Sequence, residues 1–436
     1  MKYEEIIAKL TDEQKLSLAA SLKSLADPAF AEAGIPALRY IGPHRANARC
    51  GYVLPSYAAM ANSWNAGLIY GATAMLAAQA HADGVNFMFT PQLRLRSDPY
   101  ERGMTEDPYL GDVYAHAAAD AIKSCGVLPC LTGCGLGERD AAFLDKEVNP
   151  RALHEYFLRP FSSYASGENP AVAAPFTQLG GSYRNVNKNI IGGYLRKSAP
   201  NGFVVCTKAD KEAGAACLAA GELLWSGDLT LLREAYENFK QLKEAVYRGE
   251  SSPEELEAAC AAGTALDESV LNEAADRAIG LAFLCEQFAA NGRAEFPQDL
   301  SYAASLESIV LLKNKGVLPL KAGSRVAVIG RIGTPYGATT ETMFAETLAR
   351  GDRCAVIGAA AGYDLAGDRS DDLLDQACLC ADGADTVVLF LGTDAQREEK
   401  MIVEGKVRLP ANQLALLSAL RERGKKVIAV LAGGLT

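Results

Sequence analysis

The sequence lacks the patterns that mark membrane-spanning, secreted and nucleic-acid-binding proteins. Its longest apolar runs, such as 387–391 and 427–432, are far too short to cross a bilayer. The opening residues, MKYEEIIAKL, do not show the basic and then apolar order of a signal peptide. Lysines and arginines form no cluster, and the formal net charge is −10, so we expect neither nucleic acid nor a membrane as a partner. Together these absences predict a cytoplasmic protein.

The cysteines lack the spacing of a metal site or a disulfide framework. They number 11, an odd count, and contain no CxxC pair. Cys378 and Cys380 are spaced differently from paired zinc ligands, and so is the group Cys125, Cys130 and Cys134. We therefore expect reduced, mostly buried thiols. No metal ion and no other cofactor is predicted.

Apolar strands and amphipathic helices alternate through the first half of the chain, which at 436 residues is too long for one ordinary domain. The predicted strands are 85–89, 127–131, 171–176 and 202–206. The predicted helices are 64–82, 109–124, 149–165, 188–197 and 208–224. This alternation indicates βα units and a parallel sheet, and several such units in succession favour a TIM-type (β/α) barrel.

A second alternation follows a group of helices within 229–290 and a linker-like stretch at 290–299. Its predicted strands and helices are 325–330, 339–349, 370–382, 386–392, 411–423 and 426–434. This pattern predicts an α/β sandwich domain that is incomplete, because the last strand has no covering helix. We expect a fragment or an unusually short version, and whether Thr436 is the natural end stays open. The uncovered strand also suggests a homo-oligomer.

Five stretches, in order along the chain, resemble glycoside hydrolase family 3, the β-glucosidase family. They are LTDEQKLSL at 10–18, GIPALRYIGPH at 34–44, TEDPYLGD at 105–112, AASLESIVLLKNKGVLPL at 303–320 and LPANQLALLSAL at 409–420. The resemblance implies three parts. Residues 1–290 are the N-terminal-type barrel with a helical extension, 291–324 are a linker leading into the second domain, and 325–436 are the C-terminal-type α/β sandwich domain.

The resemblance also implies a retaining mechanism, in which one carboxylate attacks the sugar and a second carboxyl group, about 5 Å away, protonates the leaving oxygen. The family's nucleophile is the Asp of a G-F-V-V-S-D-W segment. GFVVCTK at 202–208 aligns with that segment. It places Thr207 at the nucleophile position and Lys208 where an aromatic residue is expected. A threonine hydroxyl is a poor nucleophile without an activating base.

The positions that hold the sugar in the family also differ. The Asp that ends the first strand is replaced by Ile41, although His44 remains and would face the barrel mouth. The Lys-His pair after another strand is replaced at Thr132, and Arg102 is the one stand-in for a shortened Gly-Arg loop. By resemblance, these residues and Lys208 line the substrate-binding cleft. An isoleucine cannot supply the paired hydrogen bonds that recognise a monosaccharide.

The acid/base position is ambiguous. The segment 392–413 aligns with the family loop that supplies the acid, and either Glu398 or Glu404 could take that role. Asp210 and Glu212 follow the Thr207 strand, and they are the nearby carboxylates that could replace the nucleophile. One turn into a helix, they would point differently from a side chain at the tip of a strand.

Two hypotheses for function follow from the residues and the resemblance. The first is a degenerate glycosidase scaffold, a pseudoenzyme that binds a carbohydrate-like ligand or a partner protein at the old cleft. The alternative is an active β-glycosidase of the β-glucosidase type, hydrolysing O-glycosyl bonds with displaced carboxylates. The identity of the sugar is open under both hypotheses.

Overall fold

The structure is a computed structural model. It describes residues 1–41, 54–93, 103–133, 149–165, 167–168, 170–174, 202–207, 214–292, 299–331, 340–351, 354–364, 370–393 and 408–433. The chain divides into two compact units, Met1–Val310 and Leu311–Thr436.

The first unit is built on a six-stranded sheet in which every strand is parallel to its neighbours and the spatial order follows the sequence. Its strands are β1 (Tyr40–Ile41), β2 (Phe87–Gln92), β3 (Leu128–Thr132), β4 (Ala171–Ala174), β5 (Phe203–Cys206) and β6 (Leu223–Leu224). A parallel sheet in strict sequential order, with helices between the strands, is the arrangement of a TIM-type barrel wall. The predicted fold class of this half is confirmed.

The helices of the first unit begin at residues suited to capping. Thr11 accepts a hydrogen bond from the Gln14 amide, and the Gln14 side chain accepts one from the Thr11 amide, which completes a capping box. The helices before β4 are α1 (Glu4–Ile7), α2 (Asp12–Ala20), η1 (Leu22–Ala26), α3 (Pro28–Glu32), α4 (Tyr57–Ala61), α5 (Ala66–Ala82), α6 (Pro108–Ser124), α8 (Pro150–Ala152), η2 (Leu153–Phe157), η3 (Arg159–Phe161) and α9 (Ser162–Ala165). The later ones are α12 (Gly214–Ala220), α13 (Leu229–Arg248), α14 (Pro253–Ala262), α15 (Glu268–Asn291) and α16 (Ser301–Glu307).

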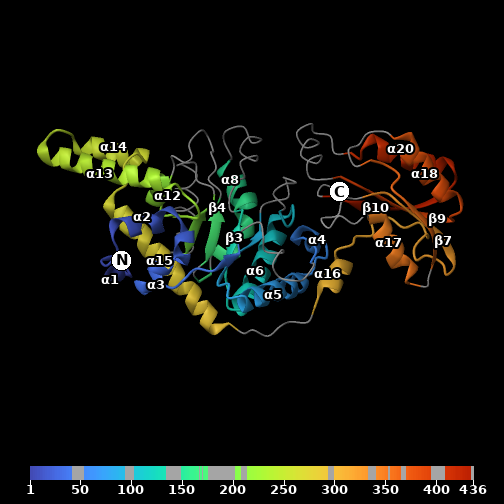
Figure 1. Cartoon of the computed structure of the whole chain (residues 1–436), viewed down its shortest axis with the longest axis horizontal. Helices are drawn as coiled ribbons and strands as arrows, with labels where there is room; N and C mark the ends of the chain where they lie inside the picture. Colours follow the sequence, from blue (N-terminus) through green and yellow to red (C-terminus); the bar gives the residue numbers. More distant parts are fainter. Residues whose placement is uncertain are drawn as a thin grey trace. The chain divides into compact units, whose positions relative to one another are not determined.

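The two faces of this sheet have different cores, because successive residues of a strand point to opposite faces. Val172 and Val204 pack with side chains of α5 and α6 on one face. Ala171, Ala173 and Val205 pack with side chains of α2 and α15 on the other. Helices α13 and α14 extend away from the sheet as an antiparallel pair (Figure 1).

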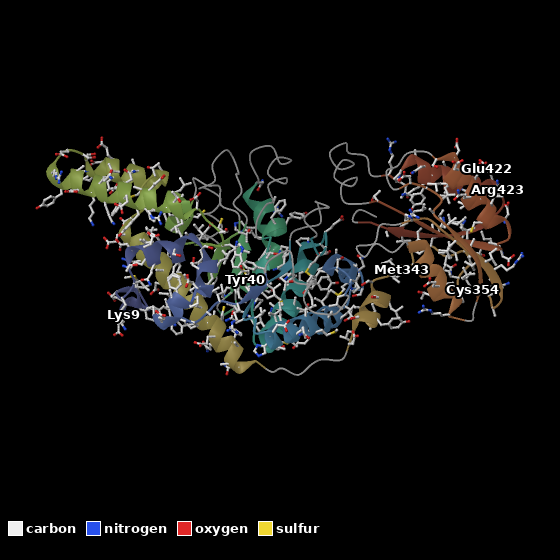
Figure 2. The ribbon with its side chains drawn as sticks, in the orientation of Figure 1. Lys9, Tyr40, Met343, Cys354, Glu422 and Arg423 are labelled. Carbon is white, nitrogen blue, oxygen red and sulfur yellow. The ribbon has the colours of Figure 1, made fainter. Side chains whose placement is uncertain are left out.

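An aromatic cluster fixes β1 against the end of β6. The ring of Trp225 meets the rings of Tyr40 and Phe89 edge to face, at centroid distances of 4.4 and 4.6 Å. Such pairs add to the stabilisation that comes from burying their area. Figure 2 labels Tyr40, which is half-buried, in the first unit.

The TEDPYLGD segment has a structural role at the start of α6. Asp107 caps the helix by accepting hydrogen bonds from the amides of Tyr109 and Leu110, at 2.8 and 3.0 Å. Asp112 is buried and accepts from the Ser163 amide at 2.9 Å and the Ser163 hydroxyl at 2.7 Å. Its Oδ2 also lies 3.4 Å from the Arg159 guanidinium. The segment therefore anchors α6 to η3 and α9.

Three predictions of secondary structure need correction. The helix predicted through residue 224 ends at Ala220, because Gly221 adopts a φ of +90°, and Leu223–Leu224 then form β6. The helix predicted over 149–165 is a series of short α, π and 3₁₀ turns. A strand was missed at 354–360, where alanine and glycine weaken the β signal.

The second unit is a four-stranded parallel sheet in the order β10-β9-β7-β8. Its elements are β7 (Ser324–Ile329), α17 (Thr340–Ala349), β8 (Cys354–Ala360), α18 (Asp371–Asp382), β9 (Thr386–Gly392), α20 (Ala411–Glu422) and β10 (Lys426–Ala432). Helix α17 covers one face of the sheet and helices α18 and α20 cover the other (Figure 1). Strand β10 lies at an edge and is partly exposed along its length. This is the predicted α/β sandwich architecture.

Within the described ranges, no helix combines the length and the apolar character needed to span a bilayer.

Candidate functional site

The carboxyl ends of the unit 1 strands meet at one edge of the sheet, which is where a TIM-type barrel carries its functional side chains. Three residues predicted for the site are described there. Ile41 ends β1, Thr132 ends β3 and Thr207 directly follows β5. Thr132 lies opposite Ala173 of β4 in the parallel register. The fold therefore brings these strand ends to a common edge.

The three residues differ in how far they are available to a ligand. Ile41 is 3% exposed and belongs to an apolar cluster with side chains of α5 and α6. Thr132 is buried, and its hydroxyl donates to the carbonyl oxygen of Pro91 at 3.2 Å, which joins the ends of β2 and β3. Thr207 is half-buried. Ligand contact by any of them stays a prediction.

The other residues named from the sequence lie outside the described ranges, and their roles stay predictions. They are His44, Arg102, Lys208, Asp210, Glu212, Glu398 and Glu404.

The described ends of β1 to β5 carry no acidic side chain. The described residues that end or directly follow β1 to β5 are Ile41, Gln92, Leu93, Thr132, Gly133, Ala174, Cys206 and Thr207. Retaining glycoside hydrolysis needs a carboxylate that attacks the sugar and a carboxyl group that protonates the leaving oxygen. Neither group is supplied by this part of the edge.

A second set of reactive side chains lies beside the end of β5. The Cys206 and Cys217 thiols and the Glu222 carboxylate lie within 4.8 Å of one another, and all three residues are buried. Burial raises the pKa of the Glu222 carboxyl to about 7, and the neighbouring Cys217 and Cys206 thiols act in the opposite direction. Neither thiol makes a hydrogen bond of normal geometry to the carboxylate, whose oxygens have no such partner among the described residues. Thiols are weak donors, so they satisfy a buried carboxylate poorly.

The local fold explains how these three residues meet. After α12, the Glu222 amide donates to the Cys217 carbonyl oxygen at 3.0 Å, which folds the chain back at Gly221. Strand β6 then pairs with β5, with Leu224 opposite Cys206. Of the three, Cys206 falls within the GFVVCTK segment that aligns with the family's nucleophile segment. The available signal for Glu222 was a single acid within the apolar run 215–225.

The site and fold can be compared with known proteins. Residues 33–262 match the family model described as the glycosyl hydrolase family 3 N terminal domain. Residues 309–435 match the glycosyl hydrolase family 3 C-terminal domain. A thermostable beta-glucosidase B from Acetivibrio thermocellus is 26% identical over 99% of this chain and 60% of its own length. An exo-alpha-(1->6)-L-arabinopyranosidase from Bifidobacterium longum is 25% identical over 87% of this chain and 51% of its own length. The chain thus spans little more than half the length of these relatives.

Solved structures show the same fold. The family 3 beta-glucosidase from Bifidobacterium adolescentis superposes with a TM-score of 0.70 at 24% identity, covering 98% of this chain and 64% of its own. The beta-glucosidase from Listeria innocua in complex with glucose gives a TM-score of 0.71 at 19% identity, over 99% of this chain and 69% of its own. At these identities the likeness concerns the fold alone. The two family models together cover most of the sequence, and the chain belongs to glycosyl hydrolase family 3.

Proposed function

We propose that this chain is a degenerate family 3 glycosidase that binds a carbohydrate-like ligand and does not hydrolyse it by the family's double-displacement route. The observation that carries the proposal is Thr207, a half-buried alcohol directly after β5, in the segment that aligns with the family's nucleophile. The relatives named beta-glucosidase and arabinopyranosidase act on sugars, which supports a carbohydrate as the ligand class.

The chemistry of an alcohol differs from that of a carboxylate in two ways. A carboxylate is charged at neutral pH, so it attacks the anomeric carbon directly and stabilises the positive charge that develops on the sugar. The Thr207 hydroxyl carries no charge and needs a neighbouring base to become nucleophilic. Removing a nucleophile from an enzyme lowers its rate by several orders of magnitude.

The replacements at the other described strand ends support the same function. Ile41 is apolar and buried, and the Thr132 hydroxyl already donates to a backbone carbonyl. Monosaccharides are recognised by charged and amide side chains that bind adjacent hydroxyls in pairs. We therefore propose a ligand that differs from the β-glucoside of the relatives.

The test is a comparison of turnover with binding. The purified chain is incubated with chromogenic β-glucoside, β-xyloside and N-acetylglucosaminide, and sugar binding is measured in parallel by calorimetry. We expect binding to at least one carbohydrate and no turnover above that of the buffer. Carbohydrate binding without turnover would support the proposal.

Turnover that disappears in one carboxylate variant would overturn the proposal in favour of an active enzyme with displaced carboxylates. The variants are Asp210→Asn, Glu212→Gln, Glu398→Gln and Glu404→Gln. Glu257→Gln, on the exposed side of α14, is the matched control and should change nothing. No binding to any carbohydrate would also count against the proposal.

A further inference from the structure

We propose that Cys206, Cys217 and Glu222 form a metal site that takes a zinc ion, bound by two thiolates and one carboxylate. The site lies between β5, α12 and the turn before β6. It is separate from the sugar-binding function proposed above, and it can be true or false independently of that function.

The first support is the distance between the donor atoms. A tetrahedral zinc ion binds sulfur at about 2.3 Å and oxygen at about 2.1 Å, so neighbouring ligand atoms lie roughly 3.6–3.8 Å apart. The three donor atoms here lie within 4.8 Å of one another. Small side-chain rotations, of roughly 1 Å at the donor atoms, therefore suffice to close the site around an ion.

The second support is the Glu222 carboxylate, which is 1% exposed. Both of its oxygens are buried without a hydrogen-bond partner among the described residues. Buried polar groups are nearly always paired in folded proteins, and an unpaired carboxylate is among the costliest groups to bury. A cation bound to the carboxylate would provide the missing partner.

The third support is the nature of the donors. Both cysteines are free thiols, so their sulfur atoms are available as ligands, and a bound ion would displace the thiol protons. Sulfur ligands favour zinc and other soft or borderline ions over calcium and magnesium, which prefer oxygen. Three protein ligands leave one position for a water molecule or a further ligand.

The surroundings give the ion a structural role. Cys206 and Cys217 belong to an apolar cluster with Leu218, Leu224 and Leu232. An ion there would tie the end of β5 to α12 and to the start of β6. It would thus hold in place the strand tip that carries the residue at position 207.

The experiment measures metal binding by the whole chain. The protein is purified with a reductant, stripped with a chelator and titrated with Zn²⁺ against a colorimetric competitor. Cobalt replaces zinc in a second titration, because thiolate ligands give Co²⁺ a charge-transfer absorption in the near ultraviolet. We expect one tightly bound equivalent of either ion, and a higher melting temperature when zinc is present.

Variants locate the ion. Cys217→Ser and Glu222→Gln should each lose the tight equivalent, and Cys217→Ser should also weaken the cobalt absorption. Cys285→Ser is the control, because Cys285 is an equally buried free thiol in a different core cluster, and it should bind as the parent chain does. Circular dichroism checks that each variant is folded. Glu222→Gln preserves the shape of the side chain, so the test does not depend on Cys217→Ser being stable.

Three outcomes would overturn the proposal. The first is the absence of a stoichiometric ion in the parent chain. The second is equal binding by Cys217→Ser and Cys285→Ser, which would place the ion elsewhere. The third is a disulfide between Cys206 and Cys217, found by mass spectrometry of the protein purified without reductant.

Discussion

Thr207 differs from a carboxylate by its charge as well as by its shape. Neighbouring residues could fill the space that a missing carboxylate leaves, but only another acidic side chain could supply its negative charge. The described residues at the ends of β1 to β5 offer none. At the scale of single residues, the proposed loss of glycosidase chemistry therefore depends on one substitution and on the absence of an acidic side chain at the described ends of β1 to β5. Glu222, the described acid near Cys206, precedes β6 and is 1% exposed.

Asp112 is the opposite case, an acidic residue whose contacts give it a structural role. It accepts hydrogen bonds from Ser162 and Ser163 and lies beside the Arg159 guanidinium. We predict that Asp112→Asn lowers the free energy of unfolding by about 1–3 kcal/mol, because a buried hydrogen-bonded charge is lost and its donors are left badly matched. Urea unfolding measures the change.

The control for this prediction is Asp120→Asn. Asp120 pairs with His116 on the surface of the same helix, with about half of its side chain exposed, so its loss should cost less than about 0.5 kcal/mol. Equal losses for the two variants would contradict the structural role of Asp112.

At the scale of elements, the sequence predicts the helices that have a continuous periodic pattern and recognisable capping residues. Helices α5, α6 and α20 begin and end close to their predicted residues, because each has a continuous helical pattern. Strand β6 could not be predicted, since a two-residue strand shows no periodicity and is stabilised by its pairing with β5. Strand β8 was missed because its alanines and glycine carry little β preference.

The Cys206, Cys217 and Glu222 cluster could not be predicted for a related reason. Their spacing matches no known metal motif, and the reversal of the chain at Gly221 becomes specific only when β6 pairs with β5. The contact depends on a tertiary pairing, which is absent from any local pattern. The threonine at position 207, where the family has its nucleophilic aspartate, is in contrast predicted by aligning one short segment with the family.

Two glycines with a positive φ differ in how closely other backbone atoms approach them, and this difference predicts different costs of substitution by alanine. Gly126 has a φ of +82°, and a β-carbon there would lie 2.5 Å from the α-carbon of Gly292 at the end of α15. Gly249 has a φ of +73°, but a β-carbon there would meet nothing within 4 Å. We predict that Gly249→Ala costs about 1 kcal/mol of folding free energy, the strain of a left-handed alanine.

Gly126→Ala should cost roughly 1–3 kcal/mol more than that, because backbone must also move. Chemical denaturation of the two variants gives the comparison. If both variants lose the same free energy, the close approach of Gly126 to Gly292 is not a constraint on the fold.

At the scale of the whole molecule, the two units have separate hydrophobic cores. Leu131 lies in a cluster made of unit 1 residues, and Leu389 lies in one made of unit 2 residues. The two tryptophans, Trp64 and Trp225, both belong to unit 1. Tryptophan fluorescence therefore reports on the first unit, whereas circular dichroism reports on both.

We predict that Leu389→Ala destabilises the second unit by about 2–5 kcal/mol, because it leaves a cavity in a fully buried core. The circular dichroism transition in urea should broaden or split while the fluorescence transition stays in place. Leu131→Ala is the matched variant and should move the fluorescence transition. A shift of the fluorescence midpoint by Leu389→Ala would contradict independent unfolding of the two units.

The measurement that bears most directly on the account is a search for a covalent sugar adduct. The chain is incubated with a 2-deoxy-2-fluoro glycoside that carries a good leaving group, alongside an active family 3 β-glucosidase, and intact masses are recorded. We predict an increase of one fluorosugar for the active relative and none for this chain. A fluorosugar attached to residue 207, or to any neighbouring side chain, would contradict the account.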